Sequence, residues 1–190
     1  MRWMRKRLKR LLTMPKARII AGTHRRLQFE TGDLPQTRPV KDRVKESLFN
    51  QLEPFHYERV LDAFAGAGSL SFEAISRGAK WVDAVEQDRA AFQLLTRNIN
   101  ALKMPIKAIR MDVFEFVETD QDPYDLILLD PPYKAALLEP FLKALKKHGK
   151  LTPHTRLICL HETPFDAPDF EVLSSRKLGR TSITHLKELR

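Results

Sequence analysis

From residue 59 onward, short apolar runs alternate with amphipathic segments. The predicted strands are Arg59 to Phe64, Trp81 to Glu86, Ile106 to Arg110, Tyr124 to Asp130 and Arg156 to His161. The predicted helices are Leu70 to Arg77, Arg89 to Leu102, Val113 to Glu118 and Leu137 to His148. This alternation is typical of strand–helix–strand units with right-handed crossovers. Because Leu126 to Leu129 is continuously apolar, we expect an α/β fold with a mostly parallel sheet covered by helices on both faces.

The two ends of the chain add smaller elements. Arg18 to Phe29 alternates around a turn-prone Ala21-Gly22-Thr23, which predicts a small hairpin. Apolar residues then recur every four positions from Val40 to Leu52, which predicts a helix. Phe170 to Ser174 and Arg180 to Leu189 predict two closing antiparallel strands, which brings the sheet to seven.

Length and charge indicate one domain behind a basic leader. The 190 residues match the usual size of a single domain, and no apolar run is long enough to span a membrane. Residues 1–18 carry eight Lys or Arg and no acid, whereas the remainder carries 25 bases and 24 acids. The apolar stretch in the leader 1–17 is too short for the apolar part of a secretory signal, so we expect a cytoplasmic protein. The leader suits either a nucleic-acid partner or a solvated extension, and Met14 is an alternative first residue.

Cysteine and histidine usage excludes several kinds of site. The single Cys159 cannot form an internal disulfide and lies within an apolar run, which predicts a buried strand thiol rather than a nucleophile. The six histidines show no zinc-binding spacing, so we expect no metal.

A glycine turn follows the first strand of the core. Asp62-Ala63-Phe64-Ala65-Gly66-Ala67-Gly68 connects an apolar strand to a helix, so backbone N–H groups and the helix N-terminus face the crevice beyond the strand. Such a turn also has a purely steric explanation. Glu86 ends the next strand, 20 positions after Gly66, where a carboxylate accepts ribose hydroxyls in nucleotide-binding folds.

The ligand is predicted from what this turn lacks. It has neither the third small residue of a dinucleotide fingerprint nor a phosphate-binding lysine, which disfavours a pyrophosphate. S-adenosylmethionine carries an ammonium group instead, and Asp62 supplies a carboxylate beside it. Asp112 either bonds an adenine amino group or caps the helix at Val113, and one side chain can do both.

Asp130-Pro131-Pro132-Tyr133 is the most specific motif. The two prolines remove backbone donors and end the strand, which leaves bare carbonyls at the rim of the crevice. The Asp130 carboxylate and the Pro131 carbonyl can accept both hydrogens of an exocyclic amine, and Tyr133 offers an aromatic face to a base.

Together these motifs resemble class I S-adenosylmethionine-dependent methyltransferases, which have a Rossmann-like fold. Three further segments resemble the 16S rRNA (guanine-966-N2) methyltransferase family: Arg18-Ile19-Ile20-Ala21-Gly22, Arg38-Pro39, and Asp42 to Asn50. The likeness covers residues 18–189. It implies one methyltransferase domain over 18–190, in which a hairpin and helix at 18–53 precede a Rossmann-like core at 54–190. The final strand lacks the aromatic residues often found in the family.

The resemblance also assigns residues to roles. Asp62, Gly66 and Gly68 would line the methionine part of the cofactor, Glu86 the ribose and Asp112 the adenine, with Phe64, Ala65, Gln87 and Val113 lining the same site. Asp130, Pro131, Pro132 and Tyr133 would hold the guanine. Arg25, Arg26, Arg38, Lys41 and Arg43 would contact RNA, although Arg43 can instead pair with Glu46.

The implied reaction is direct methyl transfer to guanine N2 in 16S ribosomal RNA, free or within a small ribosomal subunit or its assembly intermediate, by a monomer. Two alternatives remain at this point. One is a DNA adenine-N6 methyltransferase, for which 190 residues leave little room for target recognition. The other is a non-catalytic RNA-binding or ribosome-assembly factor on the same fold.

Overall fold

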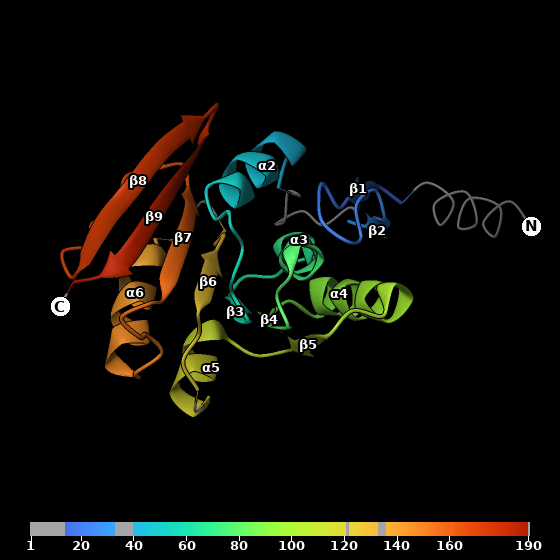
Figure 1. The fold of residues 1–190 in the computed structure, drawn as a ribbon. Coiled ribbons are helices and arrows are strands. Elements are labelled where there is room, and N and C mark those ends of the chain that lie inside the picture. Colours follow the sequence, from blue (N-terminus) through green and yellow to red (C-terminus); the bar gives the residue numbers. More distant parts are fainter. Residues whose placement is uncertain (1–13, 33–39, 121, 133–135, 190) are drawn as a thin grey trace, which may run out of the picture.

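A seven-stranded sheet forms the centre of the molecule in a computed structural model that describes residues 14–32, 40–120, 122–132 and 136–189 (Figure 1). Its strands lie in the order β5-β4-β3-β6-β7-β9-β8. They are β3 (Arg59–Asp62), β4 (Trp81–Val85), β5 (Ile106–Ile109), β6 (Leu126–Leu129), β7 (Arg156–His161), β8 (Phe170–Leu178) and β9 (Thr181–Glu188). The first five are parallel, and β9 pairs antiparallel with both β7 and β8. The predicted fold class is confirmed.

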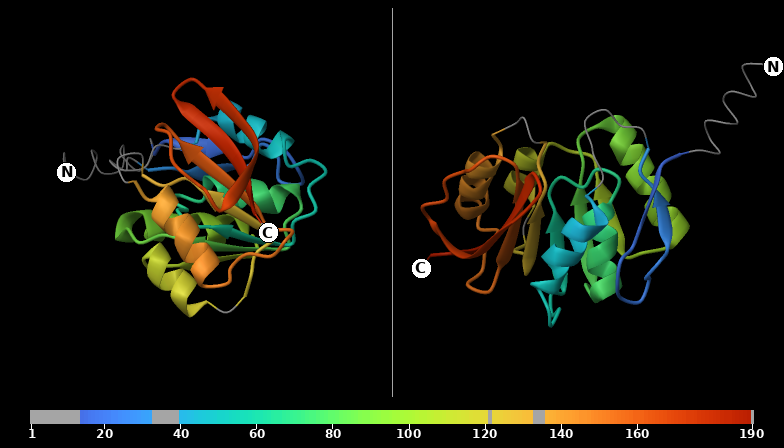
Figure 2. Two further views of the ribbon diagram at one scale, coloured as in Figure 1. Left: turned by 90° about the vertical axis from the view of Figure 1, so that its left-hand side faces the viewer. Right: turned by 90° about the horizontal axis from the view of Figure 1, so that it is seen from above.

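Helices cover both faces of this sheet (Figure 2). They are α2 (Asp42–Asn50), α3 (Ser69–Arg77), α4 (Arg89–Leu102), α5 (Val113–Thr119) and α6 (Leu138–Lys147). One apolar core joins the sheet to α2, α3 and α4, and a second joins it to α5 and α6. Along β6, Leu126 and Leu128 enter the first core while Ile127 and Leu129 enter the second, which explains the unbroken apolar run.

The predicted boundaries are close to the observed ones, and two elements coincide with them, α4 and β7. The largest difference is β8, which continues to Leu178 instead of ending at Ser174. Its second half is polar because β8 is the edge strand, where exposed side chains carry no apolar alternation. No helix in the described ranges combines the length and apolarity needed to cross a bilayer.

The N-terminal segment is tied to α3 by buried polar contacts. The strands β1 (Lys16–Arg18) and β2 (Gln28–Glu30) pair antiparallel, so a hairpin is present, but both strands extend beyond the predicted Arg18 to Phe29 and the connection spans residues 19–27 instead of the short predicted turn. Between them, the Ile20 and Ala21 amides donate to the Glu73 carboxylate over 2.8 and 3.1 Å. Glu73 is fully buried, so these donors stabilise its charge away from water.

Replacing Gly22 by alanine should detach this segment. Gly22 has φ +80°, and an added Cβ would lie 1.8 Å from the Ser76 carbonyl oxygen. We expect Gly22→Ala to lower the free energy of unfolding by about 2–4 kcal/mol, measured by urea denaturation. Gly149→Ala is the matched control, since Gly149 has φ +65° but no atom of the described residues lies within 4 Å of its Cβ position. It should cost only about 1 kcal/mol; equal losses in the two variants would contradict the docking role of Gly22.

Candidate active site

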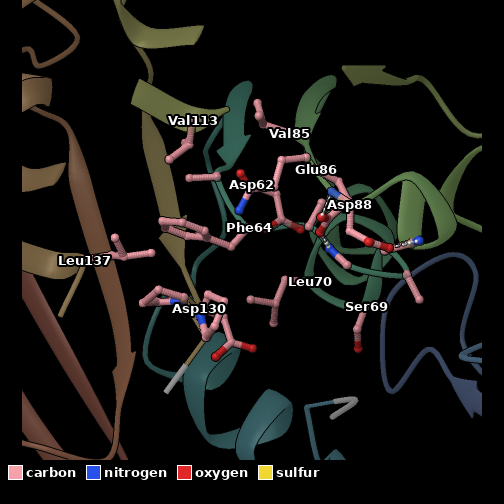
Figure 3. A pocket seen from close by; sticks show the side chains of 18 of the residues that line it. Asp62, Phe64, Ser69, Leu70, Val85, Glu86, Asp88, Val113, Asp130 and Leu137 are labelled. Carbon is pink, nitrogen blue, oxygen red and sulfur yellow. Dashed lines mark hydrogen bonds between the residues drawn. The ribbon is translucent and has the colours of Figure 1, made fainter. Parts of the chain in front are cut away.

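A cavity of about 450 Å³ opens at the carboxyl ends of β3, β4, β5 and β6 (Figure 3). Its walls come from the segments that follow these four strands: residues 62–67, 85–88, 111–114 and 130–132. Thr31, from the N-terminal segment, and Val40, just before α2, also line it, as do Ser69, Leu70, Ala90, Ala91 and Leu137. The parallel sheet therefore brings together most residues that the sequence assigned to the cofactor and the reaction.

The charge of the cavity wall is one-sided. The described lining residues include five carboxylates, those of Asp62, Glu86, Asp88, Asp112 and Asp130, and none of these lining residues is Lys, Arg or His. This wall repels phosphate and favours a ligand that carries positive charge.

The glycine turn is held to β4 through Glu86. The Gly66 amide donates to Glu86 Oε2 over 2.9 Å, and the Asp88 amide donates to Oε1 over 2.7 Å. Burial raises the pKa of Glu86, while these two backbone bonds oppose the shift. The carboxylate that the spacing assigns to a ribose is therefore also bonded directly to the glycine turn.

Gly68 lies in the same turn but is packed against the core. It is absent from the cavity wall, and its φ of +95° makes it the N-cap of α3. An added Cβ would lie 2.6 Å from the Phe72 ring and 2.8 Å from Leu95 Cδ1. The structure therefore places Gly68 against the core, where its missing side chain allows α3 and α4 to approach each other.

Asp62 is the most deeply buried carboxylate of the site. Only 1% of its surface is exposed, and the Ser71 hydroxyl donates to Oδ2 over 2.6 Å. Its other oxygen, Oδ1, has no hydrogen-bond partner among the described residues. Burial raises the pKa of Asp62 to about 6, although the Ser71 bond lowers it. A buried oxygen without a donor, on the wall of a cavity, is suited to a cationic ligand.

Asp130 faces the same cavity from the end of β6. Burial and the negative charge of Asp62 together raise the pKa of Asp130 to about 7. Pro131 is buried and Pro132 exposed, and both line the cavity. Tyr133, the last residue of the motif, lies outside the described residues, as does Arg38.

The part of the cavity wall around Asp112 is more apolar than the sequence indicated. Asp112 caps α5 by accepting from the Phe114 amide over 2.9 Å, so the predicted cap is confirmed. Met111, Val113 and Phe114 line the cavity beside it, and Gln87, two residues after the end of β4, lines it as well. Sequence reasoning missed Met111 and Phe114 because apolar residues next to a helix start are indistinguishable from core; their position flanking Asp112 was the available signal.

Phe64 and Ala65 complete the wall on the side of the glycine turn. Both line the cavity, and the Phe64 ring meets Phe141 of α6 edge-on with centroids 5.6 Å apart. A second, smaller hollow of about 110 Å³ shares Pro131, Pro132 and Leu137 with the main cavity. Pro131 and Pro132, which we call the proline corner, therefore lie between the main cavity and this second hollow.

The predicted RNA-contacting residues fall into two groups. Lys41 and Arg43 are exposed at the start of α2, close to Val40 on the cavity wall, and no ion pair joins Arg43 to Glu46. Arg25 and Arg26 are exposed in the turn that hydrogen-bonds Ser76, near the end of α3 remote from the cavity. The nine residues of α3 separate them from the cavity by about 13 Å.

Removing the Ser71 hydroxyl should raise the pKa of Asp62 further. A hydrogen bond to the charged form favours ionisation, so Ser71→Ala should move the Asp62 titration upward from about 6 in carbon-13 NMR of the carboxyl groups. Ser69→Ala is the control, because the buried Ser69 hydroxyl has no hydrogen-bond partner among the residues that the structure describes. An identical Asp62 titration in the two variants would show that the Ser71 bond does not tune this carboxyl.

The comparisons with known proteins agree with this geometry. The sequence family described as Conserved hypothetical protein 95 matches residues 17–187. Ribosomal RNA small subunit methyltransferase D of Escherichia coli (strain K12) is 37% identical over 136 residues, which cover 70% of this chain and 69% of that protein. The Haemophilus influenzae protein of the same name is 36% identical over 159 residues, 80% of this chain and 81% of that one.

Solved structures show the same fold. A methyltransferase from Escherichia coli superimposes with a TM-score of 0.82 at 28% identity, over 93% of this chain and 100% of that chain. A methylase from Haemophilus influenzae gives 0.77 at 34% identity, over the same shares. This chain has the class I methyltransferase fold, and it belongs to the Conserved hypothetical protein 95 family as a relative of the ribosomal RNA small subunit methyltransferase D proteins.

Proposed function

We propose that this protein transfers the methyl group of S-adenosylmethionine to the exocyclic N2 of a guanine in 16S ribosomal RNA. The observation that carries the proposal is the meeting of the Asp62 carboxylate and the Asp130-Pro131 corner in one acidic cavity. The relatives named ribosomal RNA small subunit methyltransferase D support RNA as the substrate. The choice of N2 and of guanine 966 rests on the motif resemblance.

The residues of the cavity fit this cofactor. The unpartnered Oδ1 of Asp62 suits the ammonium group, and Glu86 suits the ribose hydroxyls. Met111, Val113 and Phe114 offer apolar surface to the adenine, beside the Asp112 carboxylate. The lack of a cation among the described lining residues disfavours NAD and nucleoside phosphates. When bound, S-adenosylmethionine supplies an electrophilic methyl group on a positively charged sulfur.

Asp130 and Pro131 would orient the acceptor nitrogen. The carboxylate and the Pro131 carbonyl accept the two amine hydrogens, which turns the nitrogen lone pair away from the ring and toward the methyl group. The methyl–nitrogen bond forms as the methyl–sulfur bond breaks and leaves its electron pair on sulfur, so positive charge passes to the nitrogen beside the Asp130 carboxylate. This carboxylate can then take the surplus proton from the nitrogen and release it to water, and the barrier falls because the acceptor is already in place. No covalent enzyme intermediate and no metal are required.

The target base reaches this corner only after leaving its stack. Unstacking costs a few kcal/mol, least for a nucleotide in a loop. The second hollow, on the other side of Pro131 and Pro132, provides a space for the base next to the amine acceptors. Lys41 and Arg43 would contact RNA near the cavity, whereas Arg25 and Arg26 would contact it only at a distance. We propose that the protein acts as a monomer in the cytoplasm, on free 16S RNA or on an assembling small subunit.

Purified protein should methylate 16S RNA at guanine N2. We expect mass spectrometry of nucleosides to detect N2-methylguanosine after incubation of 16S RNA transcribed in vitro with S-adenosylmethionine. N6-methyladenine formed in DNA would instead favour the alternative enzyme. A protein that fails to bind S-adenosylmethionine in calorimetry would be a non-catalytic factor.

Asp130→Ala should separate chemistry from binding. Loss of the acceptor for the amine hydrogens should lower kcat by about 100- to 1,000-fold, measured as methyl incorporation into RNA, while the Kd for S-adenosylmethionine stays within a few fold. Asp112→Ala is a useful comparison, because Asp112 lies on the adenine side and should affect Kd more than kcat. Equal loss of turnover and cofactor affinity in Asp130→Ala would contradict its role.

Cofactor affinity should fall at acidic pH. The Asp62 carboxyl, with its pKa raised to about 6, must be ionised to hold an ammonium group. Below about pH 6, affinity measured by calorimetry should therefore fall toward about tenfold for each further pH unit. Asp62→Asn should bind weakly and lose this dependence near pH 6. A wild-type affinity that is constant between about pH 8 and about pH 5 would remove Asp62 from the cation site.

A further inference from the structure

The tip of the β8–β9 hairpin lies at the same edge of the sheet as the cavity. Because β9 runs antiparallel to β7, its first residues lie beside the carboxyl end of β7. The register pairs His161 with Ser182, and Ser182 in turn with Lys177. The tip, at the top of Figure 1, is therefore two strand spacings, about 10 Å, from the end of β7.

This tip is densely basic. Arg176, Lys177 and Arg180 are all exposed around a tight turn in which Gly179 has φ +68°. Among the described residues, no acidic side chain forms an ion pair with any of the three. At the opposite end of the same hairpin, by contrast, Lys187 pairs with Glu171 over 2.8 Å. The positive charge at the tip is thus available to a partner.

A chain of hydrogen bonds connects the hairpin to the second hollow. His161 lines that hollow, and its two ring nitrogens bond the Thr163 carbonyl and the Thr184 hydroxyl, each over 2.8 Å. The Thr184 hydroxyl is also bonded to the Ser175 hydroxyl on β8 over 3.0 Å. These contacts fix the hairpin relative to the space next to the proline corner.

We propose that Arg176, Lys177 and Arg180 bind the phosphate backbone of the RNA that flanks the target nucleotide. The inference rests on the proposed function and adds a contact surface to it. The carboxylates of the main cavity repel phosphates, whereas the tip attracts them through counterion release. The phosphate backbone of an RNA strand bound at the tip therefore stays outside the acidic main cavity, while one base enters the second hollow at the proline corner.

A triple charge-neutralising variant tests this surface. We expect Arg176→Gln, Lys177→Gln and Arg180→Gln together to weaken binding of 16S RNA at least about tenfold in fluorescence anisotropy. The slope of log affinity against log salt should fall by about two, because each lost single-strand phosphate contact removes about 0.7. The KM for RNA should rise, with kcat at saturating RNA and the Kd for S-adenosylmethionine unchanged.

A second triple variant provides the control. Arg97, Lys143 and Lys147 are equally exposed but lie on α4 and α6. Their replacement by glutamine removes the same charge and should leave the KM and the salt slope much closer to wild type. Equal effects of the two triple variants, or unchanged RNA binding by the tip variant, would overturn the proposal. If wild-type protein binds RNA through the tip but transfers no methyl group, the contact surface stands and the proposed function fails.

Discussion

The site depends on one constraint, that parallel strands end at the same edge of a sheet. Asp62 ends β3, Glu86 follows β4, Asp112 follows β5 and Asp130 follows β6. Because these four strands are adjacent and in parallel register, four carboxylates that are far apart in the sequence surround one cavity. Burial, together with repulsion from a neighbouring carboxylate, raises the pKa values of Asp62 and Asp130, so a cation placed between these groups would stabilise their charged forms.

Two buried carboxylates, Asp83 and Asp62, differ in how the protein compensates their charge. At the amino edge, the buried Asp83 accepts hydrogen bonds from Arg59, Trp81 and Tyr124 over 3.0–3.2 Å. Its charge is compensated within the protein. At the carboxyl edge, Asp62 is equally buried, yet Oδ1 has no donor in the part of the chain that the structure describes. A buried carboxylate oxygen without a donor is costly unless a ligand supplies one, which supports the cation site proposed for Asp62.

The sequence predicted the parallel core well because its strands are buried on both faces and its helices are strongly amphipathic. It did not predict the role of Gly68, since the need for a missing side chain arises from Phe72 and Leu95, which only packing brings near. The buried Glu73 was also missed. It pairs with Arg77 one helical turn on over 2.9 Å, a pattern typical of an exposed helix face, whereas the Ile20 and Ala21 amides that cover it are more than 50 positions away. Long-range partners of this kind leave no local pattern.

The Asn98 side chain connects the N-terminal segment to the glycine turn of the cavity. Its side chain accepts from the Glu30 amide over 3.1 Å and donates to the Glu30 carbonyl over 2.8 Å and to the Ala67 carbonyl over 3.1 Å. One buried amide on α4 therefore joins the end of β2 to the glycine turn. Thr31, the next residue after β2, is thereby held on the cavity wall. The motif Arg18 to Gly22, which carried much of the family resemblance, thus acts through docking: it anchors the hairpin on α3 so that Thr31 closes the cavity beside the glycine turn.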